Sequence, residues 1–141
     1  MKLGCIAVVP AIGGGFVGIE CAKGRGLILP GGKVETTDPS WNHTASRELV
    51  EETGLKIPHW DFKYLWQGPD GQNHIVMAYL ASGRYKCPTK ATAEGKPQVV
   101  WPCDLYKSTF AAYYRAMFEA TIWTLTDCDC DDRWRWPGEQ A

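Results

Sequence analysis

The sequence lacks long hydrophobic runs and has almost no excess of charge. No apolar stretch approaches the roughly 20 residues that an α-helix needs to cross a bilayer, so no membrane partner is expected. The formal net charge is −1, which is not the basic excess expected of a protein that binds long nucleic acid. The apolar run at 1–10 is too short for a convincing signal peptide and is better interpreted as a first strand.

The chain also lacks internal repeats and any linker that would separate two parts. Its 141 residues are enough for one domain with a real core and too few to expect two. The apolar content of 45% and the charged content of 22% are those of an ordinary globular protein. We therefore expect a single domain over 1–141.

The six cysteines are not spaced as the framework of a small secreted protein. Cys5, Cys21, Cys87 and Cys103 stand singly in apolar or loop contexts. We expect reduced thiols and a cytoplasmic location.

The end of the chain has an unusual composition. The segment 127–132, DCDCDD, has a Cys-x-Cys spacing, which alone does not make a zinc site. We interpret it as an exposed acidic turn. The alternating segment 133–136, RWRW, is typical of an edge strand or a partner-binding segment, and a homodimer contact there is a hypothesis.

Short strands and two helices alternate along the chain. Strands are expected over 3–9, 16–22, 27–29, 62–67, 75–81 and 99–101. A first helix is expected from a cap at Asp38 or Ser40 to Thr53, where Gly54 is a natural left-handed stop. Ser108 is expected to cap a second helix. The core-facing stripe of that helix would be Phe110, Tyr113, Tyr114, Met117 and Phe118. The order predicts an α/β (α+β) fold with a mixed sheet covered by helices.

The segment 29–55, LPGGKVETTDPSWNHTASRELVEETGL, crowds negative charge onto a near-neutral chain. Because a helix advances about 100° per residue, Glu48, Glu51 and Glu52 share one face, and Arg47 lies beside them. At about 5 Å and an effective dielectric constant near 20, one such pair repels by about 3 kcal/mol. Arg47 offsets part of this repulsion, and a hard cation such as Mg²⁺ or Mn²⁺ suits an oxygen-rich carboxylate site.

A solvated acidic face is the simpler interpretation of such a helix taken alone. The double glycine, Gly31 and Gly32, favours a site, because backbone without Cβ atoms can approach a ligand or metal closely. An acidic protein-interaction surface would leave this glycine pair and the closing Gly54 unexplained.

The segment resembles the signature of the Nudix hydrolases: a glycine, five residues, a glutamate, seven residues, then Arg-Glu-aliphatic-any-Glu-Glu-any-Gly-aliphatic. Gly32 matches the first glycine, and RELVEETGL at 47–55 matches the second half without exception. Asp38 stands in place of the first glutamate, and one extra residue precedes Arg47. Loops absorb such insertions, so the helix is expected unchanged, whereas Asp38 is not expected to take part in catalysis.

The resemblance implies a Nudix-like α/β/α sandwich and a pyrophosphohydrolase that depends on Mg²⁺ or Mn²⁺. Some nucleoside-triphosphate-cleaving members carry a further metal-binding glutamate before a strand with a tryptophan, and Glu94 before Trp101 is similar. The implied metal ligands are Gly32, Glu48, Glu51, Glu52 and Glu94. The implied catalytic residues are Arg47, which would orient a carboxylate, and Glu51, Glu52 and Glu94, among which the general base is sought.

The substrate implied by the resemblance is a nucleoside di- or triphosphate-type nucleotide, cleaved to nucleoside monophosphate and pyrophosphate. An ADP-ribose or dinucleotide pyrophosphatase is the alternative, as is a non-catalytic nucleotide-binding module of the same fold. Pro69 lies near the proline common in ADP-ribose-cleaving members, but it also sits in an evident turn. Lys33, Glu35 and His74 are further candidates for substrate contact. A solvated lysine is at least as good an interpretation of Lys33, and a surface or packing histidine is the simpler interpretation of His74.

Overall fold

The computed structural model describes residues 2–121, so the expected acidic turn and dimer segment at 127–136 lie outside the described residues. The elements are β1 (Lys2–Val8), β2 (Phe16–Cys21), β3 (Leu27–Ile28), β4 (Gly31–Lys33), α1 (Trp41–Thr53), the 3₁₀ turn η1 (His59–Asp61), β5 (Phe62–Pro69), β6 (His74–Ala81), β7 (Gly95–Val100), α2 (Pro102–Leu105) and α3 (Ala111–Ala120). The expected alternation of strands and helices is confirmed.

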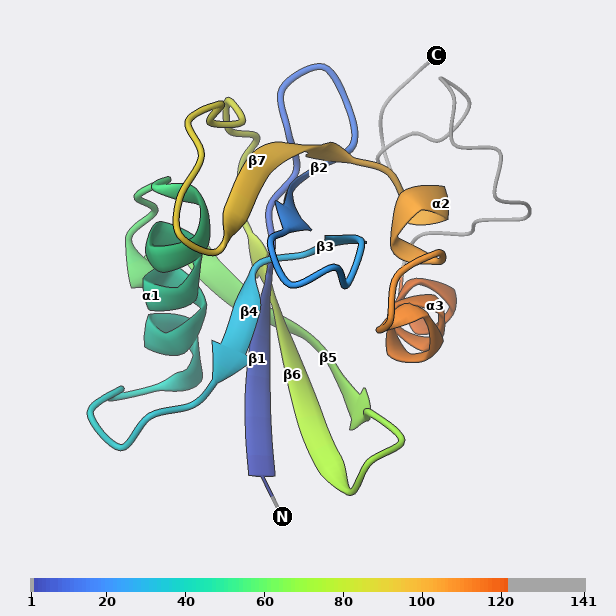
Figure 1. Ribbon diagram of the computed structural model, residues 1–141. Coiled ribbons are helices and arrows are strands. Elements are labelled where there is room, and N and C mark those ends of the chain that lie inside the picture. Colours follow the sequence, from blue (N-terminus) through green and yellow to red (C-terminus); the bar gives the residue numbers. More distant parts are fainter. Residues whose placement is uncertain (1, 122–141) are drawn as a thin grey trace.

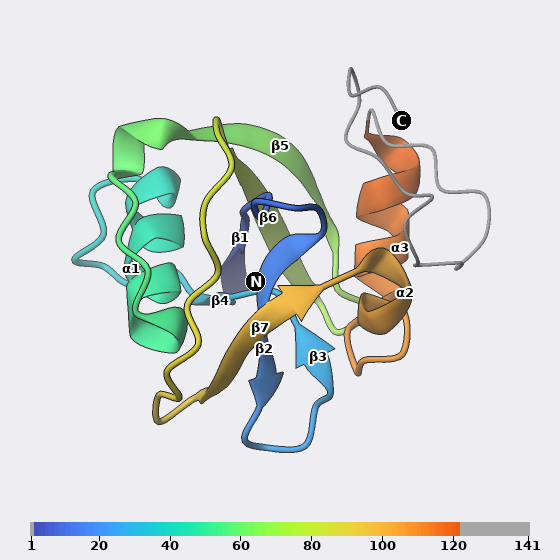
Figure 2. The ribbon, with the colours of Figure 1, turned by 90° about the horizontal axis from the view of Figure 1, so that it is seen from above.

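The strands form two sheets between helices, and Figures 1 and 2 show α1 on one side and α3 on the other. The first sheet is mixed, with strand order β4-β1-β6-β5 and β1 parallel to β6. The second sheet, β3-β2-β7, is antiparallel. The predicted α/β/α sandwich is confirmed, but its strands are divided between two sheets rather than joined in one.

The division begins at the glycine turn after β1. Gly13, Gly14 and Gly15 have φ values of 92°, 112° and 70°, which residues with a Cβ rarely adopt. The turn sends β2 away from the first sheet and into pairing with β7. β7 begins earlier than predicted, at Gly95, and includes Pro97. Within the described sheets β7 pairs only with β2, and an edge strand tolerates a residue that lacks an N–H.

The ends of α1 follow the predicted signals. Ser40 is the N-cap, and its side chain accepts a hydrogen bond from the His43 N–H. Gly54 follows the helix with φ 81°, and its N–H donates to the Val50 carbonyl at 2.9 Å. Leu49 is fully buried against the first sheet. Glu52, which carries a carboxylate, is also buried, at 6% exposure. The helix therefore places one carboxylate at the inner face of the fold.

The second predicted helix is displaced. α3 begins at Ala111, and Ser108 accepts from the Phe110 N–H at 3.2 Å in the turn before it. The short helix α2 was not predicted. The predicted stripe is confirmed at its buried members, which are Tyr113, Tyr114, Met117 and Phe118.

Tyr114 joins α3 to the segment that leads into β4. Its phenol oxygen accepts a hydrogen bond from the Leu29 N–H at 2.9 Å, and both residues are buried. Burial raises the pKa of the Tyr114 phenol well above its ordinary value. The neutral phenol therefore fixes the backbone two residues before Gly31.

Cys103 is disulfide-bonded, so the expectation of reduced thiols is wrong for this cysteine. Cys5, Cys21 and Cys87 are free thiols. Among the helices of the described part of the chain, none is long and apolar enough to cross a membrane.

Tyr114→Phe is expected to lower the free energy of unfolding by about 1–3 kcal/mol, because it leaves the buried Leu29 N–H without an acceptor. Urea unfolding measures this change. Tyr64→Phe, at a side chain that is 55% exposed, is the control and should change stability by less than about 0.5 kcal/mol. Equal losses in the two variants would contradict the assigned hydrogen bond.

Candidate active site

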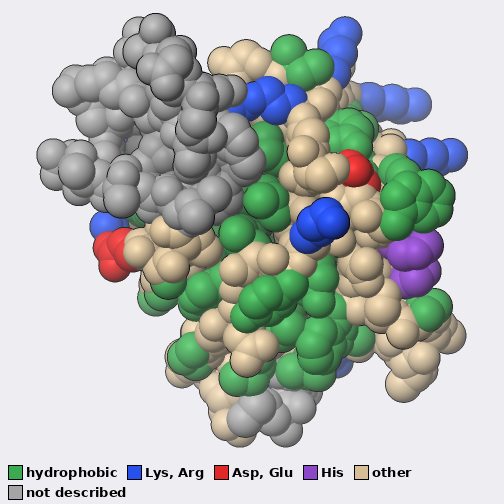
Figure 3. All heavy atoms as spheres, turned by 180° about the vertical axis from the view of Figure 1, so that it is seen from behind, with side chains coloured by type: hydrophobic (Ala, Val, Ile, Leu, Met, Phe, Trp, Pro, Cys, Tyr) green, Lys and Arg blue, Asp and Glu red, His purple; other side chains and the backbone are tan. Residues whose placement is uncertain are grey.

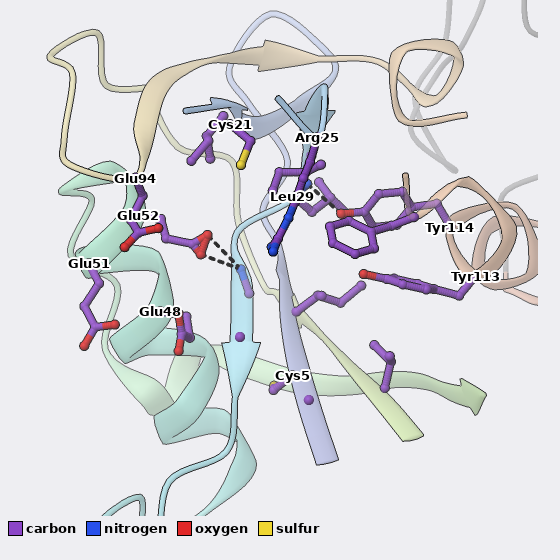
Figure 4. Close-up of a pocket in the computed structure, with 18 of the residues that line it drawn as sticks. Cys5, Cys21, Arg25, Leu29, Glu48, Glu51, Glu52, Glu94, Tyr113 and Tyr114 are labelled. Carbon is purple, nitrogen blue, oxygen red and sulfur yellow. Dashed lines mark hydrogen bonds between the residues drawn. The ribbon is translucent and has the colours of Figure 1, made fainter. Parts of the chain in front are cut away.

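Four glutamates from two separate segments meet in one cavity of about 360 Å³. Glu48, Glu51 and Glu52 come from α1, and Glu94 comes from the loop before β7. Figure 4 shows them along one side of the cavity, where they form what we call the acidic wall. The spacing on α1 was readable from the sequence, and the structure brings Glu94 to the same place.

The opposite side of the cavity is apolar and aromatic. Phe110, Tyr113 and Tyr114, from α3 and the residue before it, form what we call the aromatic wall. The Arg25 guanidinium lies 5.7 Å from the centre of the Phe110 ring and also lines the cavity. The cavity therefore offers negative charge on one side and a surface for stacking on the other.

Glu52 is held against the glycine strand β4. Its two carboxylate oxygens lie 3.0 and 3.4 Å from the Gly31 N–H, which donates to them. Burial, helped by the negative charges of Glu48, Glu94 and Glu51, raises the pKa of the Glu52 carboxyl to about 8. The Gly31 hydrogen bond opposes this shift without overcoming it. A carboxyl in such surroundings gains stability from any cation placed beside it.

The two glycines of β4 are required by close approach. A Cβ atom on Gly32 would lie 2.5 Å from Oε1 of Glu48, and one on Gly31 would lie 2.6 Å from the Cys5 carbonyl oxygen. Any side chain at Gly32 would therefore push the Glu48 carboxylate out of its place. This contact gives a physical reason for the double glycine.

Arg47 gathers carboxylates behind the acidic wall. Its Nε and Nη2 donate to the two oxygens of Asp38 at 2.9 and 2.8 Å, a bidentate pair. Nη1 donates to Glu48 at 2.9 Å and to Glu51 at 3.2 Å, and Nη2 donates to the Lys33 carbonyl at 3.0 Å. Hydrogen bonding to Asp38 raises the pKa of Arg47 further above its ordinary value. One cation thus orients two members of the acidic wall.

Asp38 is a residue whose part in the site the sequence analysis missed. Its side chain is only 5% exposed, and it accepts hydrogen bonds from the Glu35 N–H and the Thr44 hydroxyl at 3.0 and 2.9 Å. Donation from Arg47 holds the pKa of Asp38 well below its usual range. Asp38 does not line the cavity, so it positions Arg47 rather than touching a ligand. The acidic position in the motif was the signal that could have indicated this role.

The acidic wall fits a divalent cation in its chemistry. Its ligands are carboxylate oxygens, which Mg²⁺ and Mn²⁺ prefer, and within the described residues neither Glu52 nor Glu94 has an ion pair with a basic side chain. Over the same residues, no three His, Cys, Asp or Glu side chains already converge as a ligand set. Arg47 accounts for part of this, because Glu48 and Glu51 accept its hydrogen bonds.

The three further candidates for substrate contact lie away from the acidic wall. Glu35 is 55% exposed and lies 3.6 Å from Arg47. Nδ1 of His74 lies 2.8 Å from the Asp70 carboxylate. Lys33 and His74 line a neighbouring cavity of about 410 Å³, which shares Arg25 with the first. The structure therefore places Lys33 and His74 beside the cavity rather than in it.

Few acidic side chains are visible on the face of the molecule seen from behind (Figure 3). Figure 3 shows that side from behind, with hydrophobic side chains gathered over much of it and only scattered acidic ones.

Comparison with known proteins places the chain in a class of hydrolases that act on pyrophosphate bonds. The NUDIX domain family model matches residues 14–119. The chain belongs to this family, as its motif led us to expect. No curated protein matches the chain in sequence.

Three solved structures illustrate the similarity of fold. The NUDIX domain of Shewanella oneidensis NrtR, complexed with ADP ribose, has 19% identity and a TM-score of 0.64, with 83% of each chain covered. A MutT protein from Methanosarcina mazei has 23% identity and a TM-score of 0.58, over 84% of this chain and 90% of that one. A MutT/nudix family protein from Enterococcus faecalis has 21% identity and a TM-score of 0.56 over 70% of this chain, and the match spans 42% of that protein.

Metal-free protein is expected to lose stability as the pH rises from about 5 to 8. The folded pKa of Glu52, about 8, lies above the ordinary value of 4.5, so the folded state holds a proton that the unfolded state has released. Glu52→Gln removes this dependence and should raise the melting temperature at pH 8.5 by about 5 °C over the wild type.

Thermal unfolding at pH 5.5 and 8.5 in EDTA measures the difference. Mg²⁺ at pH 8.5 should raise the melting temperature of the wild type and have a smaller effect on the variant. Melting temperatures that change in parallel between the two pH values would contradict the raised pKa.

Proposed function

We propose that the protein is a pyrophosphohydrolase dependent on Mg²⁺ or Mn²⁺, which cleaves a nucleoside triphosphate or related nucleotide to the nucleoside monophosphate and pyrophosphate. The observation that carries the proposal is the cavity itself. Its acidic wall matches a metal-bound pyrophosphate, and its aromatic wall matches the base or sugar of a nucleotide.

The reaction first requires that the negative charge of the phosphate oxygens be neutralised. When bound, a divalent ion neutralises the phosphate oxygens and lowers the pKa of a water molecule. Glu48, Glu51, Glu52 and Glu94, with the Gly32 carbonyl, are the groups that would hold it. Because four carboxylates converge on one cavity, they repel one another, and they would also repel a polyphosphate approaching without its cations. Substrate and metal are therefore expected to bind together.

The chain must also control where a proton goes. One glutamate of the acidic wall accepts the proton that the attacking water loses, in the role of general base. Arg47 donates hydrogen bonds to Glu48 and Glu51, and its charge opposes the rise in the pKa of Glu48 that burial causes. Arg47 therefore keeps these carboxylates oriented without entering the cavity. The Gly31 N–H does the same for Glu52.

The substrate end of the cavity supports a nucleotide more than a bare pyrophosphate. Tyr113 and Phe110 present ring surfaces, and Arg25 adds a positive charge next to them. Aromatic rings and a guanidinium group can stack on a base, and the guanidinium can also pair with a phosphate. The acidic and aromatic walls together would hold the two ends of one substrate for attack in line.

ADP-ribose is the second candidate substrate. The observation that favours it is the similarity of fold to the Shewanella oneidensis NUDIX domain complexed with ADP ribose. The products distinguish the two candidate substrates, because ADP-ribose would give AMP and ribose 5-phosphate, whereas a triphosphate would give pyrophosphate. A non-catalytic module is disfavoured, because every carboxylate of the motif on α1 is present.

The cellular location, the number of domains and the oligomeric state do not follow from the cavity. A single domain over 1–141 and a cytoplasmic location stay predictions. The homodimer contact at 133–136 stays a hypothesis. A gel-filtration mass unchanged by deletion of 127–141 would count against it.

The enzyme should release pyrophosphate from at least one nucleoside triphosphate in the presence of Mg²⁺. Phosphorus NMR of a panel of ribo- and deoxyribonucleoside triphosphates, ADP-ribose and dinucleotides identifies the substrate and the bond cleaved. Glu51→Gln and Glu52→Gln should each lower kcat by about 100-fold or more, because each removes a ligand or base from the acidic wall.

Glu20→Gln is the matched control, because Glu20 is exposed on β2 and does not line the cavity. It should leave turnover unchanged. Absence of turnover with every compound, or full activity in both acidic-wall variants, would refute the proposed function.

A further inference from the structure

Thr92 connects the two segments that carry the acidic wall. Its hydroxyl donates a hydrogen bond to the main-chain carbonyl of Glu52, on α1, at 2.8 Å. The same oxygen accepts a hydrogen bond from the N–H of Glu94 at 3.2 Å. One side-chain oxygen atom therefore lies between the backbones of two glutamates that face the same cavity.

The Glu52 carbonyl is available for this contact because it lies in the last turn of α1. The final four carbonyl groups of a helix have no partner within the helix. The Gly54 N–H donates to the Val50 carbonyl. The Glu52 carbonyl needs a donor from outside the helix. Thr92 supplies the donor from a segment that is 40 residues away along the chain.

The end of this loop, residues 92–95, is also held by main-chain hydrogen bonds. The Thr92 N–H donates to the Gly95 carbonyl at 2.8 Å, and the Ala22 N–H, after β2, donates to the Glu94 carbonyl at 3.0 Å. Gly95 cannot be replaced without movement, because a Cβ atom there would lie 2.1 Å from the Glu20 carbonyl oxygen. The loop end is thus fixed to the second sheet, and Thr92 joins it to α1.

The hydrogen bonds of Thr92 hold together two segments whose carboxylates repel each other. Glu52 and Glu94 line the same cavity, and two carboxylates that face one cavity repel each other. Without a tether, repulsion favours movement of the exposed loop glutamate away from the helix. A divalent ion needs the opposite, because its carboxylate ligands must come together around it.

We infer that Thr92 is a positioning residue: its hydroxyl sets the spacing between Glu52 and Glu94, and thereby the affinity of the acidic wall for a divalent cation. This inference rests on the proposed function and names a residue that the family motif at 32–55 does not contain. Residues outside a metal's ligand set that orient its ligands commonly change metal affinity by about 10- to 100-fold.

Direct binding of Mn²⁺, measured by electron paramagnetic resonance of the free ion, tests the inference without turnover. Thr92→Val removes the hydroxyl with little change in shape and should weaken Mn²⁺ binding about tenfold. Thr92→Ser keeps the hydroxyl and should retain wild-type affinity within about twofold. Thermal unfolding of each variant confirms that folded protein is compared.

Thr53→Val is the matched control for a merely structural role. The Thr53 hydroxyl lies at the same end of α1, donates to the Leu49 carbonyl at 2.7 Å and accepts from the Leu55 N–H at 3.1 Å. It therefore makes the same two kinds of hydrogen bond but does not reach Glu94. Thr53→Val should lower the melting temperature and leave Mn²⁺ affinity unchanged. Equal loss of affinity in the Thr53 and Thr92 valine variants would overturn the inference.

A double-mutant cycle isolates the path through Glu94. If Thr92 acts by placing this carboxylate, Thr92→Val should weaken Mn²⁺ binding much less in the Glu94→Gln background than in the wild type. The same fold-change in both backgrounds overturns the inference, as does wild-type affinity in Thr92→Val. Failure of the proposed function has another signature: wild-type protein that shows no saturable Mn²⁺ binding, or binding that Glu52→Gln leaves unchanged.

Discussion

Repulsion among carboxylates that share one cavity is the constraint on which the rest of the structure depends. Four acidic side chains on 35–51 lie around a single arginine, Arg47, which pairs with Asp38 on both oxygens and reaches two members of the acidic wall. Glu52 is buried, and among the described residues its carboxylate accepts a hydrogen bond only from the Gly31 N–H. Arg47 thus compensates the outer carboxylates, whereas among the described residues Glu52 and Glu94 have no ion pair with a basic side chain. This inner side of the wall is where the proposed cation would bind.

The cavity is positioned by contacts that are distant in sequence. Gly31 and Gly32 let β4 lie directly against β1 and the Glu48 carboxylate. The glycine turn after β1 separates two sheets. β7, in the second sheet, then brings Glu94 to the same cavity as the glutamates of α1.

The parts that could be predicted from the sequence depend on local physics. The ends of α1 follow from Ser40 and Gly54, because capping is decided within a few residues, and the common face of the motif glutamates follows from helical periodicity. Glu94 was named only through resemblance to a family. The bond from Leu29 to Tyr114 spans 85 residues, and the tether at Thr92 spans 40. No periodicity or local motif indicates such pairs, because they exist only once the tertiary fold has formed.

Between Leu29 and Gly31, where the chain enters β4, two main-chain N–H groups bind opposite walls of the cavity. The Leu29 N–H is bound by Tyr114 of the aromatic wall, and the Gly31 N–H is bound by Glu52 of the acidic wall. Figure 4 shows the two bonds on either side of this segment. Three residues of backbone therefore link the two walls of the cavity. A movement of α3 that pulled on Leu29 would act on Gly31, and through it on the Glu52 carboxylate.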